Sequence, residues 1–99
     1  MKIIYSSALL AALFAAAPAF ADGDQLHYER NRQSYISHER AAQIAVSAVG
    51  GGQATEVEFD RSRTKPDHFD VDVRAADGRK HEVEIDAKTG SVLSNRLDD

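Results

Sequence analysis

Acidic side chains at alternate positions are the feature of this sequence best suited to chemistry. They fall in three segments where apolar and polar residues alternate: Glu56, Glu58, Asp70, Asp72, Glu82 and Glu84. Because alternate side chains of an extended strand point to one face, the six carboxylates are predicted to form one negative surface. Such a surface can attract a basic partner or hold divalent cations weakly through oxygen ligands. A solvated face without a ligand is the alternative.

Other chemistry has little support in the residue spacing. The four histidines, His27, His38, His68 and His81, include no pair at i, i+4, and the sequence contains no cysteine, so their spacing predicts no metal site. No serine has a base and oxyanion donors at suitable spacing, and the carboxylates are expected on an open face without a pocket. We therefore expect no catalytic residue, no metal ligand set, no cofactor and no enzyme activity.

Strands are the elements that would position the carboxylates. The alternation over residues 55–60, 68–74 and 80–86 has the period of half-buried strands. It places Thr55, Val57 and Phe59 on the inner face of the first strand. His81 falls on the inner face of the third, where a partly buried, hydrogen-bonded ring is expected.

The connection at 76–78 determines the pairing of the second and third strands. A two-residue loop would set apolar side chains opposite acidic ones. A three-residue loop with Gly78 in the left-handed conformation instead pairs Val71 with Val83 and Phe69 with Ile85. The same register sets Asp72 beside Glu82 and Asp70 beside Glu84, and these like charges must be screened or neutralised.

A helix is predicted before the strands. Ser37 suits the N-cap position, and an alanine-rich stripe follows helical spacing until Gly50 to Gly52 end the helix: Ala41, Ile44, Ala45, Ala48 and Val49. After the third strand, Asp86, Thr89 and Gly90 favour a compact turn, followed by a short fourth strand or strand extension. The predicted fold class is α+β, with one N-terminal helix packed on a three-stranded antiparallel β-meander.

The N-terminus has the order of a cleavable secretory signal. Lys2 precedes an apolar run over residues 3–17, then Pro18 and a small-x-small site that places cleavage between Ala21 and Asp22. The run is shorter than the ~20 residues needed to span a bilayer, and because the sequence has no cysteine, a lipid-modified cysteine after the cleavage site is excluded. We expect a periplasmic or secreted protein with no stable membrane anchor after cleavage. The net charge of −4 argues against nucleic-acid partners.

Three segments together resemble the PepSY domain family. They are ISHERAAQIA (36–45), FDVDV (69–73) ahead of Asp77-Gly78, and EVEIDAKTGSVL (82–93). The predicted organisation is a signal at 1–21, a flexible lead-in at 22–35, a PepSY-like domain at 36–95 and a polar tail at 96–99. The resemblance implies a helix on a small antiparallel sheet, an extracytoplasmic role and no catalytic residues.

The resemblance also implies a function. It indicates a non-catalytic exported interaction or regulatory module that modulates or inhibits a peptidase in the cell envelope, with another envelope or secreted protein as partner. The alternative is weak divalent-cation binding or buffering through the acidic sheet face.

Overall fold

A computed structural model describes residues 23–98 of the chain. The predicted signal segment at 1–21 and its cleavage site between Ala21 and Asp22 lie outside the described residues. In chain order the elements are α2 (Gly23–Arg30), the 3-10 turn η1 (Arg32–Ser34), α3 (His38–Ala48), β1 (Gly52–Asp60), β2 (His68–Ala75), β3 (Lys80–Asp86) and β4 (Val92–Leu97).

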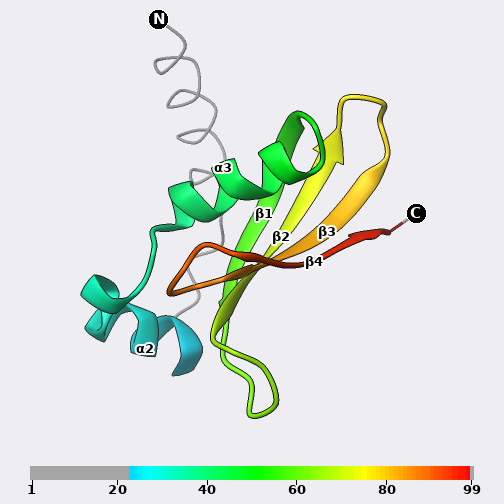
Figure 1. The fold of residues 1–99 in the computed structure, drawn as a ribbon. Helices are drawn as coiled ribbons and strands as arrows, with labels where there is room; N and C mark the ends of the chain where they lie inside the picture. Colours follow the sequence, from blue (N-terminus) through cyan, green and yellow to red (C-terminus); the bar gives the residue numbers. More distant parts are fainter. Residues whose placement is uncertain (1–22, 99) are drawn as a thin grey trace, which may run out of the picture.

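The four strands form one antiparallel sheet in the order β1-β2-β3-β4, and α3 lies across one face of it (Figure 1). This arrangement confirms the α+β class and the helix on a meander. The fourth strand is longer than predicted, because Arg96 pairs with Glu82 and Leu97 with His81. The expected polar tail at 96–99 is therefore in part a strand.

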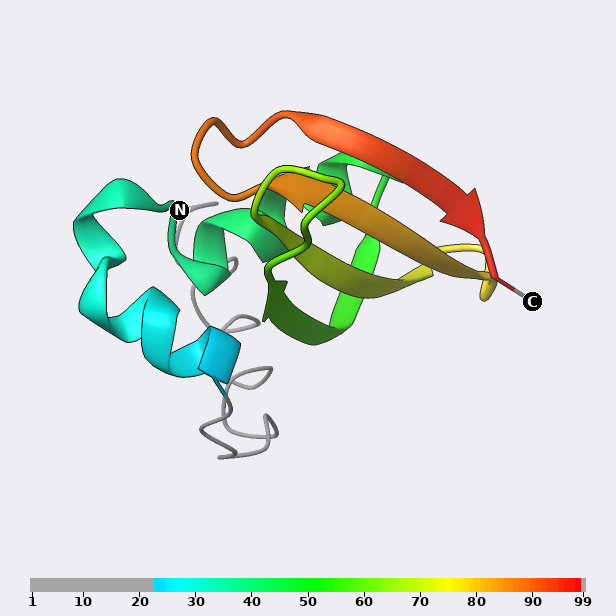
Figure 2. The same ribbon diagram turned by 90° about the horizontal axis from the view of Figure 1, so that it is seen from below.

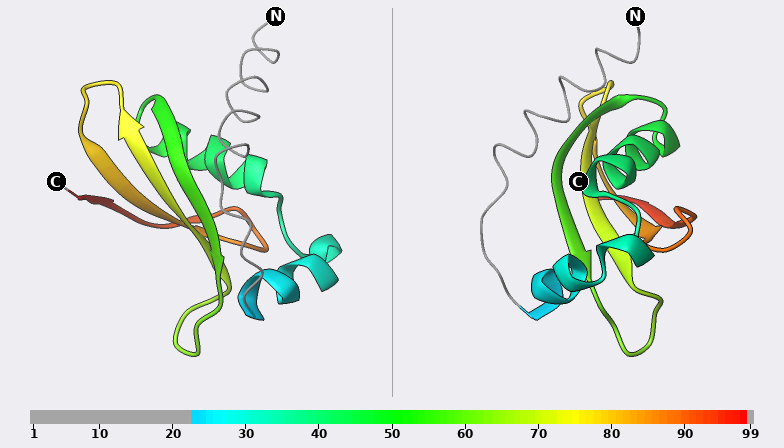
Figure 3. Two further views of the ribbon diagram at one scale, coloured as in Figure 1. Left: turned by 180° about the vertical axis from the view of Figure 1, so that it is seen from behind. Right: turned by 90° about the vertical axis from the view of Figure 1, so that its left-hand side faces the viewer.

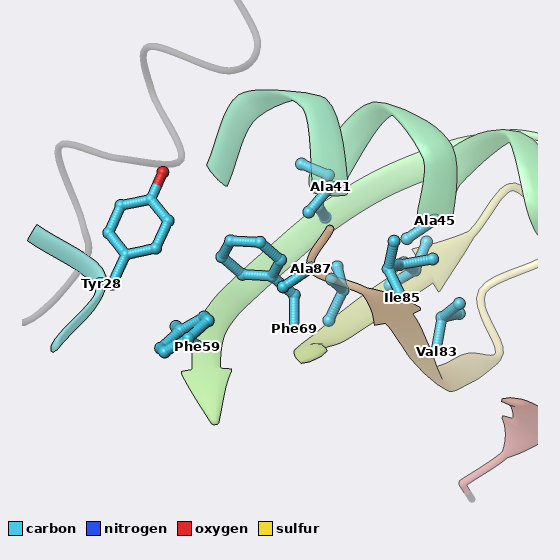
Figure 4. Packing of buried hydrophobic residues seen from close by; sticks show 12 residues of the cluster. Tyr28, Ala41, Ala45, Phe59, Phe69, Val83, Ile85 and Ala87 are labelled. Carbon is cyan, nitrogen blue, oxygen red and sulfur yellow. The ribbon is translucent and has the colours of Figure 1, made fainter. Parts of the chain in front are cut away.

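Helix α3 begins at a capped residue and packs through alanine. The Oγ atom of Ser37 accepts a hydrogen bond of 3.0 Å from the backbone amide of Arg40, which satisfies one of the free amides of the first turn. Ala41, Ala42 and Ala45 are fully buried. Their small side chains let the helix backbone approach the sheet closely, as Figure 4 shows for Ala41 and Ala45.

The core lies between α3 and the inner face of β2 and β3. Phe69, Val71, Val73, Val83 and Ile85 are completely buried there, and burial of each such side chain contributes about 1.5–3 kcal/mol. The predicted pairs Val71–Val83 and Phe69–Ile85 are confirmed. The connecting loop has Gly78 at φ +88°.

Strand β1 departs from the simple alternation at Thr55. The register shifts between Ala54 and Glu56, so Thr55 is the additional residue of a β-bulge. Its side chain is exposed, and Ala54 faces the core in its place. The prediction of Thr55 on the inner face was wrong because a bulge reverses the alternation on one side of it.

The segment before α3 is helical and packed, whereas the sequence predicts a flexible lead-in. Tyr28 of α2 is buried in the core cluster, with its ring centroid 5.3 Å from Phe59 and 5.8 Å from Phe69. Its hydroxyl donates to the carbonyl of Ile36 at 3.1 Å. A single aromatic anchor docks α2, so no apolar period reveals it. Figure 3 shows α2 packed against the end of β1 that leads into the β1–β2 loop.

A polar network also attaches α2 to the loop at 61–67. Arg61 forms an ion pair with Asp24 at 3.3 Å, and its guanidinium lies 3.1 Å from His27 Nδ1. His27 Nε2 lies 2.9 Å from the Tyr35 hydroxyl, which donates to Asp67 at 2.7 Å. Burial, followed by this bond to Asp67, raises the pKa of Tyr35 to about 12.

Candidate functional site

The face of the sheet turned away from α3 carries the acidic side chains in two cross-strand rows. One row runs Glu56–Asp72–Glu82 and the other Glu58–Asp70–Glu84. The structure thus brings all six residues together on one surface, which we call the acidic face.

Basic side chains of the same chain neutralise part of the acidic face. Lys65 Nζ lies 3.0 Å from Glu84 Oε2, Lys80 Nζ lies 3.9 Å from Asp72 Oδ2, and Arg96 pairs with Glu82. These contacts relieve the repulsion between the acidic pairs. Burial raises the pKa of Asp72, and Lys80 partly offsets that effect.

The loop at 61–67 lies at the joined ends of β1 and β2 (Figure 1) and contacts one end of the acidic face through Lys65. Lys65 reaches Glu84, and the Asp67 carbonyl accepts from the amide of Ala87 at 2.9 Å. Glu84 is consequently 9% exposed and His68 only 1% exposed. The alternation alone predicts a solvated face, but a loop can cover it without altering the strand period.

Under this loop, His68 meets two carboxylates. Its Nε2 atom lies 3.4 Å from Asp60 Oδ2 and 3.5 Å from Asp70 Oδ1, and one ligand atom of each residue lies within 4.8 Å of the others. Asp60 pairs with His68 across β1 and β2, while Asp70 is two residues along β2.

Histidine pairs at helical spacing are not the signal that marks these three residues. The relevant signal is His68 and Asp70 at i, i+2 on one strand face. The contribution of Asp60 depends on the β1–β2 register, which the sequence analysis left open.

Burial and the neighbouring carboxylates in this cluster disfavour the charged form of Asp70. Burial is the main cause that raises the pKa of Asp70, to about 6, and the nearby carboxylates of Glu84, Asp60 and Glu82 add to it. His68 acts in the opposite direction. The site therefore favours a positive group beside Asp70.

Strand β4 forms an edge of the sheet and exposes apolar side chains. Among the described residues 23–98, β3 is the only strand that pairs with it, and Figure 2 shows β4 along the outer margin of the sheet. Val92, Leu93 and Leu97 are 46%, 40% and 47% exposed. The outer side of β4 thus presents backbone amide and carbonyl groups that pair with no described strand. It also presents exposed apolar side chains. The residues of this edge were not among the sites predicted from the sequence.

The remaining predicted residues have structural contacts. Asp86 accepts from the amides of Lys88 at 2.8 Å and Thr89 at 2.9 Å, and Gly90 has φ +82°. His81 Nδ1 lies 3.1 Å from Asn95 Oδ1. These contacts stabilise the β3–β4 connection and pairing.

Fold and sequence together define a small α+β module with one helix packed on a four-stranded antiparallel sheet. Residues 35–96 match the PepSY family, described as "Peptidase propeptide and YPEB domain". The match spans more than half of the chain, and the chain belongs to this family. PepSY domains are generally non-catalytic propeptide or regulatory modules and occur in exported proteins.

The other comparisons add no relative. Neither the curated proteins nor the solved structures gave a match. Within residues 23–98, no helix has the length and apolar character to cross a membrane.

Proposed function

We propose that this protein is an exported, non-catalytic module that binds a peptidase of the cell envelope or the secreted fraction and limits its activity. Membership in a family named for peptidase propeptides supports the class of partner. The observation that carries the proposal is the β4 edge with its three exposed apolar side chains.

The β4 edge suits an extended segment of the partner. A strand added beside β4 pairs with its outer backbone groups, and the apolar side chains supply contact area. Exposed edges otherwise promote aggregation and are usually blunted by charge, bulges or cover. The opposite edge, β1, has a bulge at Thr55, exposed Glu56 and Glu58, and α2 packed against its end. Docking is therefore expected at β4.

Site-specific crosslinking in intact cells tests this proposal. A photoreactive residue in place of Leu93 is expected to capture a peptidase, because Leu93 lies on the docking edge. Leu97→Glu should abolish capture, since it places a charge among the apolar contacts.

Leu26→Glu is the matched control. Leu26 is 45% exposed, as β4 leucines are, but lies in α2. It should leave capture unchanged. Absence of any peptidase among the products, or equal loss with both variants, would contradict the proposal.

A further inference from the structure

The His68 ring is buried and held in one orientation. It is 1% exposed, and its Nδ1 atom lies 2.9 Å from the carbonyl oxygen of Pro66. A carbonyl can only accept, so Nδ1 carries a hydrogen and Nε2 faces Asp60 and Asp70. Histidines that ligate metals are usually oriented in this way, by donating the other ring N–H to a carbonyl or carboxylate.

The distances around Nε2 fit a shared ion better than direct hydrogen bonds. Charge-assisted N–H to carboxylate bonds measure about 2.7–2.9 Å, whereas Nε2 lies 3.4 Å from Asp60 and 3.5 Å from Asp70. Ligands about 2.1 Å from a tetrahedral zinc ion are about 3.4 Å from one another. The two distances from Nε2 therefore match two edges of such a tetrahedron, and one ligand atom of each of the three residues lies within 4.8 Å of the others.

The two carboxylates beside His68 also favour a bound cation. Asp60 and Asp70 both approach His68, and the nearest lysine of the loop, Lys65, forms an ion pair with Glu84 at 3.0 Å.

We propose that His68, Asp60 and Asp70 form a binding site for one divalent transition-metal ion, with Zn²⁺ as the best match. Imidazole nitrogen selects for such ions over Ca²⁺ and Mg²⁺, which prefer all-oxygen ligand sets. Three protein ligands leave a fourth position for water. Asp60 is partly exposed, which provides access from solvent.

The ion would join the end of β1 to β2 beneath the 61–67 loop. That loop also contacts α2 directly through Arg61, and Asp67 is linked to His27 of α2 through the Tyr35 hydroxyl. Occupancy is therefore expected to stabilise the whole fold. This site is independent of docking at the β4 edge, because the two use different residues.

Calorimetric titration of the purified, chelator-treated protein with ZnCl₂ tests the site. One saturable Zn²⁺ ion per chain is expected, with a rise in the unfolding temperature. Asp60→Asn should weaken binding by at least about tenfold, and millimolar CaCl₂ should not displace the ion. Glu58→Gln is the matched control, since it removes the same charge from the same face outside the cluster, and it should bind as the parent does.

A spectroscopic measurement on the parent protein tests the site without relying on a variant, which could lose its structure. In the nitrogen-15 spectrum of the parent protein's imidazoles, Zn²⁺ should shift His68 Nε2 and leave Nδ1 protonated. No saturable Zn²⁺ binding would overturn the site in favour of direct contacts between the His68 ring and the two carboxylates. Equal weakening in Asp60→Asn and Glu58→Gln, or displacement by CaCl₂, would overturn it in favour of diffuse binding.

Discussion

Tyr28 of α2 packs against Phe59 of β1 with ring centroids 5.3 Å apart, and this contact attaches the N-terminal helix to the core. Tyr28→Ala is expected to lower the free energy of unfolding by about 3 kcal/mol, because it removes a buried ring and leaves a cavity. Tyr28→Phe loses only the hydrogen bond to Ile36 and should cost about 1 kcal/mol. Urea denaturation measures both. A loss below about 1 kcal/mol for Tyr28→Ala would show that α2 is not part of the cooperative core.

His38 makes the stability sensitive to acid. Burial lowers its pKa from the ordinary 6.5, outweighing the opposite effect of Glu39. The folded state therefore binds a proton less readily than the unfolded state, so stability is full above pH 6.5 and falls as the pH drops towards the lowered pKa. Urea midpoints measured between about pH 7.5 and 5.5 should decline, and His38→Phe, which keeps the ring packing, should reduce the decline. An unchanged slope in His38→Phe would assign the acid sensitivity to other groups.

The acidic face is expected to assist docking to a partner with a basic surface. Affinity should then fall as ionic strength rises from about 0.05 to about 0.5 M, because salt screens exposed charges. Glu56→Gln, at an exposed position of that face, should lessen the salt dependence. Affinity that is constant across this range would exclude the acidic face from docking.

Export should leave a defined N-terminus. Intact-mass measurement of the protein recovered from the periplasm or the medium is expected to find Asp22 as its first residue, because Ala19 and Ala21 fit the small positions of a cleavage site. A mass that retains Met1 would contradict cleavage.

The alternation of inward- and outward-facing side chains along the strands was sufficient to predict most of the fold. Once Gly78 was placed in a three-residue loop, only one register kept Val71 and Phe69 opposite apolar partners, and the structure has that register. The same parity placed the acidic residues on one face, since side-chain direction follows the backbone period.

Features that depend on single contacts were not predictable in the same way. The bulge at Thr55 changes the parity without a marked sequence signal, and α2 is docked by Tyr28 and a polar network in place of an apolar stripe. The cluster at His68 requires the β1–β2 register and the covering loop, both of which are tertiary features. The length of β4 was underestimated from the sequence. Arg96 and Leu97, which follow the apolar residues Val92 and Leu93, also pair with β3.

Hydrogen exchange of the β4 amides in complex with the captured peptidase tests the central claim most directly. Addition of a partner strand predicts slower exchange over residues 92–97 in the complex, because outer backbone groups become hydrogen bonded. The amides of β1 should exchange as in the free protein. Unchanged exchange in β4, with protection confined to β1 or to α3, would contradict docking at this edge.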